Sequence, residues 1–96
     1  MTMYDPPHPG EFIKEVYLEP LGVSLRSVAL RIKVSPSTFS RLIKGQSSIS
    51  PGMALRLSRC LGRSPESWLR MQDSYDLWQA EQNVDLAGIE PLPMPA

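Results

Sequence analysis

Apolar residues recur three and four positions apart along most of the chain, the spacing that places side chains on one face of an α-helix. The segments with this spacing are residues 9–20, 24–32, 35–44, 50–61 and 65–82. The strict alternation of apolar and polar residues that marks a half-buried strand is absent up to residue 65. The pattern therefore predicts an all-α fold of five helices, each with one face to bury.

Serine and proline mark where these helices begin. A serine at the N-cap accepts a hydrogen bond from an unpaired N–H of the first turn, and proline loses little at the next position because its missing N–H would have no partner there. The first helix is expected to open at Pro9. The other expected N-caps are Ser24 and the serines of Ser35-Pro36, Ser50-Pro51 and Ser64-Pro65.

Glycine and proline mark where the helices end. Gly45 and Gly62 follow apolar runs, at places where a left-handed residue can close a helix. Pro20 predicts an end or a kink of the first helix. We therefore divide the chain into an extended segment 1–8, a helical domain 9–82 and a short extended tail 83–96.

Prolines at positions 91, 93 and 95 exclude a helix from the tail. Two interpretations stay open: a frayed extended tail, which composition favours, or a short strand-like arm that lies on a partner.

The composition is that of a soluble globular protein, with 96 residues, 42% hydrophobic and 21% charged. No apolar run is long enough to span a membrane and the first residues do not resemble a secretion signal, so we expect a cytoplasmic protein. Cys60 is the single cysteine, which leaves no disulfide and no metal-ligand set. Neither a nucleophile–base pair nor a glycine-rich phosphate loop is evident. We therefore expect no enzyme activity, no metal and no cofactor.

The net charge of zero hides a strong segregation of charge along the chain. No acidic residue lies between Pro20 and Pro65, whereas the segments on either side are mainly acidic. A basic block of this kind is typical of a protein that binds nucleic acid, and the alternative is a solvated surface. The basic residues of the block are Arg26, Arg31, Lys33, Arg41, Lys44, Arg56, Arg59 and Arg63.

The helices predicted at 24–32 and 35–44 are joined by a tight turn, as in a helix-turn-helix motif. Ala29 provides the small residue that such a crossing needs, and Val28, Ile32, Val34, Phe39 and Leu42 provide its apolar contacts. Short hydroxyl side chains at the start of the second helix would allow close approach to a major groove. Arg41 could grip guanine O6 and N7 together. The alternative is a plain helical hairpin, which has the same apolar spacing.

The predicted DNA contacts come from this second helix and from the residues around it. Arg26 and three residues of the loop before residue 50 would contact phosphates without reading the base sequence. These loop residues are Gln46, Ser47 and Ser48. Arg56, Arg59 and Arg63 are as readily explained as solvated arginines. The predicted DNA-binding residues are Arg26, Ser35, Pro36, Ser37, Thr38, Ser40, Arg41, Lys44, Gln46 and Ser47.

The last helix has a broad aromatic stripe. Trp68, Met71, Tyr75 and Trp78 recur at helical spacing and offer more apolar area than a small domain readily hides. We expect this stripe to form a homodimer surface, because two-fold dimers are the usual way for such motifs to read DNA. The alternative is that the stripe seals the core against the first helix.

Several motifs follow one another in an order that resembles the HigA-type antitoxins, over roughly residues 8–80. They are His8-Pro-Gly-Glu, Leu21-Gly-Val-Ser24, Ser50-Pro-Gly-Met-Ala-Leu-Arg-Leu57, Ser64-Pro-Glu-Ser-Trp-Leu-Arg-Met-Gln72 and Tyr75-Asp-Leu-Trp78. The resemblance implies a five-helix XRE-type, lambda-repressor-like domain. It also implies a homodimer that represses its own operon and neutralises a HigB-type toxin, an mRNA-cutting ribonuclease.

Three residues depart from the pattern of that family. Lys33 stands where many such turns have glycine, so it is expected to take a left-handed conformation at some cost, or the turn differs. Gly52 stands where an acidic residue is frequent, and Arg70 where asparagine is frequent. These departures leave Thr38 and Arg41 untouched.

The sequence is compatible with three functions: a toxin-neutralising autorepressor, a stand-alone transcriptional regulator without a toxin, and a protein-interaction module with a basic face. If a basic toxin is the partner, the acidic ends of the chain would attract it, although a solvated surface explains any one of these residues. We expect His8 to serve the start of the first helix and Cys60 to fill the core. The acidic residues in question are Glu11, Glu15, Glu19, Asp73, Asp76 and Glu81.

Overall fold

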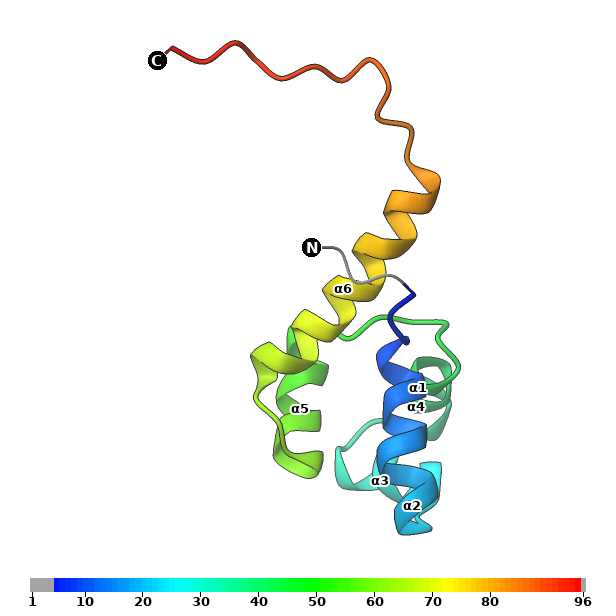
Figure 1. Cartoon of the computed structure of the whole chain (residues 1–96). Coiled ribbons are helices and arrows are strands. Elements are labelled where there is room, and N and C mark those ends of the chain that lie inside the picture. The colour runs from blue at the N-terminus through cyan, green and yellow to red at the C-terminus, as the bar shows by residue number, and fades with distance from the viewer. Residues whose placement is uncertain (1–4, 96) are drawn as a thin grey trace.

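The computed structural model describes residues 5–95 and is helical up to residue 83. The elements in order are α1 (Pro9–Ile13), η1 (Lys14–Leu18), α2 (Glu19–Leu21), α3 (Leu25–Arg31), α4 (Pro36–Ile43), α5 (Pro51–Leu61) and α6 (Pro65–Asn83). Because α1, η1 and α2 run end to end as one rod (Figure 1), the described chain has five helical units and no strand. The prediction of an all-α, five-helix fold is confirmed.

Serine caps fix the start of each of the last four helices. The hydroxyl oxygens of Ser24, Ser35, Ser50 and Ser64 each accept a hydrogen bond from the backbone N–H three residues further on. A cap of this kind contributes about 1 kcal/mol. All four predicted N-caps are confirmed.

The first helix continues past Pro20, contrary to the expected end or sharp kink there. The rod widens into a π-helical turn over Lys14–Leu18 and ends at Gly22, which has φ 65° and ψ 28°. Proline has no N–H, and its ring crowds the carbonyl four residues back, so a regular α-helix cannot pass through it. In the wider turn the N–H of Glu19 donates to the carbonyl of Lys14, five residues back.

The core lies where α1, α4, α5 and α6 meet, with α3 packed on α4 and α5 on α6. Its largest fully buried side chains are Trp68, Phe39, Ile13, Leu42 and Leu57. At Gly10 the backbone of α1 touches that of α4 so closely that an added Cβ would lie 2.8 Å from the Cα of Ile43. Only glycine fits this contact.

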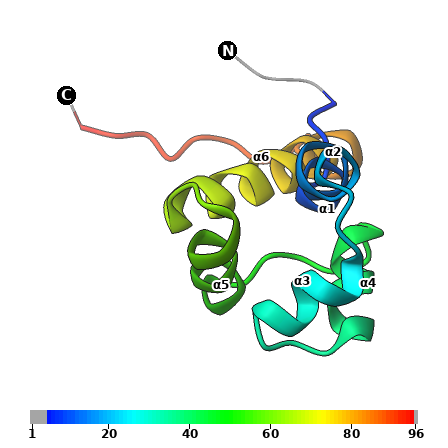
Figure 2. The same cartoon turned by 90° about the horizontal axis from the view of Figure 1, so that it is seen from below.

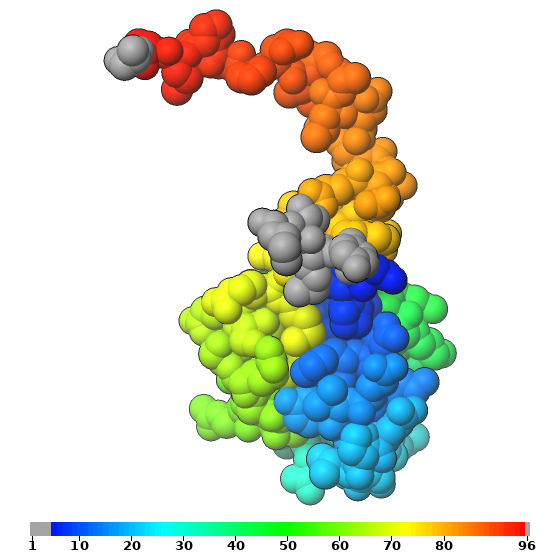
Figure 3. Space-filling view, in the orientation of Figure 1, coloured from blue at the N-terminus to red at the C-terminus, as the bar shows by residue number. Residues whose placement is uncertain are grey.

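Residues 84–95 continue from the end of α6 as an extended segment with one turn, at residues 87–88, and stand away from the body (Figures 1 and 3); every one of them is exposed. Of the segment 1–8, residues 5–8 are described, and Pro6 and His8 are buried against the domain rather than free. Within residues 5–95, no helix has the length and apolar character that crossing a membrane requires.

Candidate nucleic-acid interface

The two helices of the predicted helix-turn-helix, α3 and α4, pack through the residues that the sequence indicated. Ala29 on α3 has no exposed surface, and Val28 beside it is 3% exposed. Phe39 and Leu42 fill the facing side of α4 and are also buried. Since the small Ala29 lets the two backbones approach, the pair is held in a fixed relative orientation.

The turn between α3 and α4 is held from both sides. Lys33 has φ 63°, which confirms the expected left-handed residue, and the N–H of Val34 donates to the carbonyl of Ala29 at 3.1 Å. From α5, Nη1 of Arg56 donates to the carbonyl of Ile32 at 2.6 Å. Arg56 therefore supports the turn, a role that the local sequence pattern does not reveal because the two residues are far apart in the chain.

The outward face of α4 carries a stripe of three exposed polar side chains. Ser37, Arg41 and Lys44 recur at intervals of four and three residues and are all exposed. Pro36, Thr38 and Ser40 flank the stripe and are half-buried. We call Ser37, Arg41 and Lys44 the α4 stripe.

Two of the predicted DNA contacts have a structural task at the start of α4. The Ser35 hydroxyl oxygen accepts a hydrogen bond from the N–H of Thr38 at 3.1 Å and donates its proton to Oγ1 of Thr38 at 2.8 Å. Both hydroxyls are thus engaged with each other in the first turn. They orient the helix, while the α4 stripe presents the side chains that extend from it.

The flanking residues lie at the two ends of the helix pair. Arg26, in the first turn of α3, is exposed. In the loop between α4 and α5, Gln46 and Ser48 are exposed and Ser47 is half-buried. These positions would allow contacts with the backbone of a nucleic acid that runs along α4.

Gln72 fixes the loop between α4 and α5, a role that was not predicted from the sequence. It is 4% exposed, its Oε1 accepts from the N–H of Ile49 at 2.9 Å, and its Nε2 donates to Oδ1 of Asp76 at 3.0 Å. The available signal was its position four residues after Trp68, on the apolar face of α6, where a polar side chain must find a partner.

His8 closes the start of α1, as expected. Its Nδ1 accepts from the N–H of Gly10 at 2.9 Å, and its ring meets Tyr75 edge-on with centroids 4.9 Å apart. Burial lowers the pKa of His8 below its usual 6.5, against the opposing influence of the Ser47 backbone, Asp76 and Glu11. The folded protein therefore favours the neutral imidazole, the form whose Nδ1 can accept this bond.

Stability should fall as the pH drops through the His8 titration. The unfolded chain binds the proton more readily than the folded chain, because the pKa of His8 is lowered only in the fold. The contribution of neutral His8 to stability is therefore fully present above pH 6.5 and is lost as the pH falls below that value. Urea unfolding between about pH 7.5 and 5 measures this slope, since an unperturbed histidine titrates near 6.5. His8→Asn is the control, because asparagine caps a helix without titrating. An equal slope in His8→Asn would show that other groups cause the pH dependence.

The aromatic stripe of α6 divides into a buried and a half-buried part. Trp68 is 0% exposed, and its Nε1 donates to the carbonyl of Gly62 at 2.9 Å. The prediction of Trp68 as a dimer contact is therefore wrong, because the domain buries this side chain against Phe12 of α1, with ring centroids 6.0 Å apart. Arg63 covers both rings, 5.2 Å from the Phe12 centroid and 5.8 Å from that of Trp68. The remaining three residues of the stripe, Met71, Tyr75 and Trp78, are half-buried.

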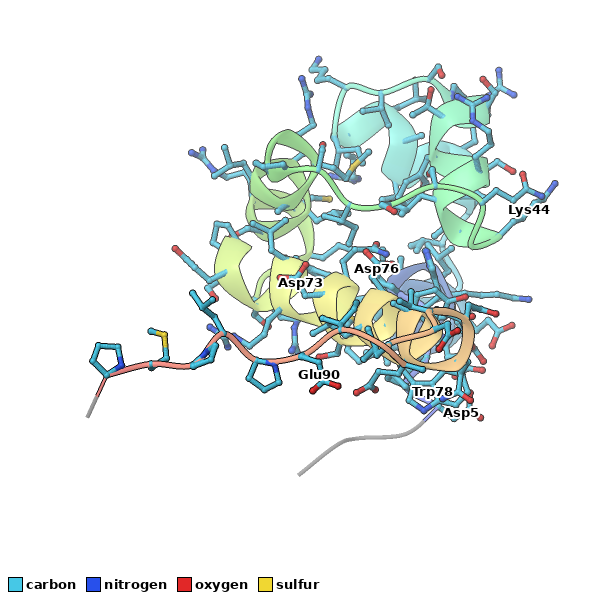
Figure 4. All side chains as sticks on the ribbon, turned by 90° about the horizontal axis from the view of Figure 1, so that it is seen from above. Asp5, Lys44, Asp73, Asp76, Trp78 and Glu90 are labelled. Atoms are coloured by element: carbon cyan, nitrogen blue, oxygen red, sulfur yellow. The ribbon has the colours of Figure 1, made fainter. Side chains whose placement is uncertain are left out.

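The fold gathers the helices of the basic block, α3 to α5, on one side of the domain. Figure 2 shows α3, α4 and α5 on one side, with the first rod and α6 on the other. In the view of Figure 4, Lys44 projects from the end of α4, while Trp78 and Glu90 lie across α6 from it. The exposed arginines and lysines of the basic block lie on α3–α5 and their connecting turns, with α4 at one edge of this group. The acidic residues predicted at the chain ends are exposed on the first rod and α6, and of these Asp73 and Asp76 lie on the side of α6 that faces α5.

Known proteins share this architecture. Residues 13–68 match the helix-turn-helix family. YddM of Escherichia coli K12, an uncharacterized HTH-type transcriptional regulator, is 41% identical over 92 residues, which make up 96% of this chain and 97% of that protein.

Two solved structures of antitoxins on DNA are also similar. Antitoxin GraA in complex with its operator has a TM-score of 0.86 at 33% identity, over 98% of this chain and 97% of that one. Pseudomonas aeruginosa antitoxin HigA with the higBA promoter has a TM-score of 0.81 at 32% identity, over 92% and 99% of the two chains. On the strength of its motifs, its helix-turn-helix and these relatives, the chain belongs to the XRE-type helix-turn-helix family and, within it, to the HigA-type antitoxins, a group of regulators rather than enzymes.

Proposed function

We propose that the protein binds double-stranded operator DNA upstream of its own gene, with α4 in the major groove. The observation that carries this proposal is the α4 stripe, which is exposed on the side of the domain formed by the basic block. The guanidinium of Arg41 can donate two hydrogen bonds to guanine, while Ser37 and Lys44 lie on either side of it. Two antitoxin relatives have been solved with an operator or a promoter. Such a protein acts where the DNA is, so the proposal places it in the cytoplasm.

Binding should weaken steeply with salt. If each protomer neutralises about four to six phosphates, the logarithm of the affinity should fall with the logarithm of salt concentration by roughly 4 to 5 per protomer. Arg26→Ala should reduce this slope by about 1 and should weaken operator and random DNA alike. Fluorescence anisotropy on both duplexes at several salt concentrations measures both effects. A selective loss on the operator would instead make Arg26 a base contact.

The proposed dimer forms through the exposed part of α6. Met71, Tyr75 and Trp78 lie on one face of α6 and remain half-buried in the single chain. Covering this surface with a second copy would place two α4 helices on one duplex and allow them to read two half-sites. Sedimentation of the wild type and of Trp78→Ala tests this, with a monomer expected for the variant.

The proposed partner is a HigB-type ribonuclease toxin, which the protein neutralises. Membership of the HigA-type antitoxins supports this proposal, as does the acidic surface of the first rod and α6. The alternative is a stand-alone regulator, which the HTH-type regulators among the relatives favour. Co-expression with the product of a neighbouring small gene distinguishes the two. Rescue of growth and co-purification support the antitoxin, and the absence of both favours the regulator.

Reversal of acidic charges should slow capture of the toxin. Glu15 and Glu19 are exposed on the first rod. Glu15→Lys with Glu19→Lys should lower the association rate about three- to tenfold at low salt, because complementary charge mainly accelerates encounter. Stopped-flow mixing measures that rate. Glu15→Gln with Glu19→Gln, which removes the charges without reversing them, should lower the rate by an intermediate amount. Operator binding should stay unchanged, and an unaltered association rate would refute the role of this surface.

A further inference from the structure

A basic groove lies between α5 and the turn that joins α3 to α4. It has a volume of about 550 Å³, and Arg31, Lys33, Leu55, Arg59 and Cys60 line it together with Ile32 and Arg56. Arg56 is committed to the carbonyl of Ile32, while Arg31, Lys33 and Arg59 are exposed. Leu55 is 62% exposed at the edge of the groove. The groove thus joins apolar surface to positive charge, and it is separate from the α4 stripe.

The tail has the opposite charge and the same apolar character. In residues 84–95 the charged side chains are Asp85 and Glu90. Its large apolar side chains are among the most exposed in the described chain, from 55% for Val84 to 77% for Leu92 and Met94. A run of exposed apolar residues of this kind marks a segment that is covered by another surface.

The direction of the tail indicates that the surface which covers it belongs to a second copy of the chain. The tail leaves α6 and stands away from its own body (Figure 3). Its prolines hold φ near −65° and so reduce the entropy that docking in an extended form would cost. A reciprocal exchange, in which each chain inserts its tail into the other, gives a closed two-fold pair.

We propose that residues 84–95 of one copy lie in the basic groove of a second copy, with Asp85 and Glu90 near the groove arginines. The inference rests on the proposed homodimer and adds to it a second contact, distant from the α6 surface. It also gives the exposed cations of the groove a role other than phosphate binding.

Cys60 provides a native probe, since it is half-buried and lines the groove. In the full-length chain, Ile89→Cys and Leu92→Cys each place a second thiol on the tail. Two thiols form a disulfide only when their Cα atoms come within roughly 4.4–6.8 Å. With diamide as oxidant we expect a covalent dimer on a non-reducing gel, and we expect Cys60→Ser to remove it. Ala80→Cys, at an exposed position on α6, is the matched control and should give little dimer.

Three outcomes would overturn the inference. A disulfide within one chain would show that the tail occupies its own groove, a dimer that survives Cys60→Ser would show tail-to-tail contact, and a yield no higher than that of Ala80→Cys would show no docking. If sedimentation still finds a dimer in these cases, the proposed α6 dimer stands and only the placement of the tail fails.

The charges of the groove supply an independent readout. Arg59→Glu should lower the crosslink yield of Leu92→Cys severalfold, because it places an acid beside an acidic tail. Arg70→Glu makes the same change of charge outside the groove and should leave the yield unaltered. An equal loss in the two variants would show that the groove does not recognise the tail.

Discussion

Gly10→Ala should remove a large part of the stability of the domain. The added Cβ would meet the backbone of α4 at Leu42 and Ile43, which cannot rotate away as a side chain can. Overpacking of this kind costs typically 1–3 kcal/mol and occasionally more, so we expect a loss of about 3 kcal/mol. In a domain of this size that corresponds to a fall in Tm of roughly 12–24 °C. Thermal and urea unfolding measure both quantities.

Gly52→Ala is the matched control for this prediction. Gly52 lies in the first turn of α5, and the nearest atom to an added Cβ there is Oγ of Ser50 at 4.0 Å. The same substitution should therefore stabilise the protein, by about 0.4–1 kcal/mol, because alanine restricts the unfolded chain. If Gly10→Ala were as stable as Gly52→Ala, the close contact between α1 and α4 would be wrong.

Arg41→Glu should abolish specific operator binding. It removes a guanine contact that is worth about 1–3 kcal/mol and places a negative charge in the major groove. We expect the affinity for the operator to fall by about a hundredfold or more, to the level of random DNA. Arg41 is exposed on α4, so the fold should not change.

Arg70→Glu controls for the change of net charge. Arg70 is exposed on α6, outside the basic side of the domain, so its reversal should weaken operator binding little. Electrophoretic mobility shift with operator and random duplexes compares the variants. Equal effects of the two substitutions would mean that Arg41 acts through net charge alone.

The sequence predicted the features that depend on residues close together in the chain. The serine caps and the closing glycines act within one helical turn, so their spacing alone located most of the helices. The α3–α4 pair was predictable for the same reason, because Ala29 and its apolar neighbours fall within one short segment. The left-handed Lys33 was one of two expectations that followed from the resemblance, because Lys33 stands where many such turns have glycine, and its φ of 63° confirms it.

The features that the sequence did not reveal depend on contacts between distant segments. Gly10 reads as an ordinary residue of a helix start until α4 is placed against it. The role of Gln72 needs the backbone of Ile49, and that of Arg56 needs the carbonyl of Ile32. Trp68 was assigned to a dimer surface because helical spacing shows which residues share a face of the helix. Spacing does not show whether the same chain or a second copy covers that face.

Affinities for operators with single base-pair changes test the claim that Arg41 reads a base pair of the operator. For the wild type, replacement of the one G·C pair that Arg41 contacts should weaken the binding free energy by about 1–3 kcal/mol. For Arg41→Ala, that same change should cost almost nothing, while changes at other positions keep their cost. An unaltered profile in Arg41→Ala, or random duplexes held as firmly as the operator by the wild type, would contradict the claim.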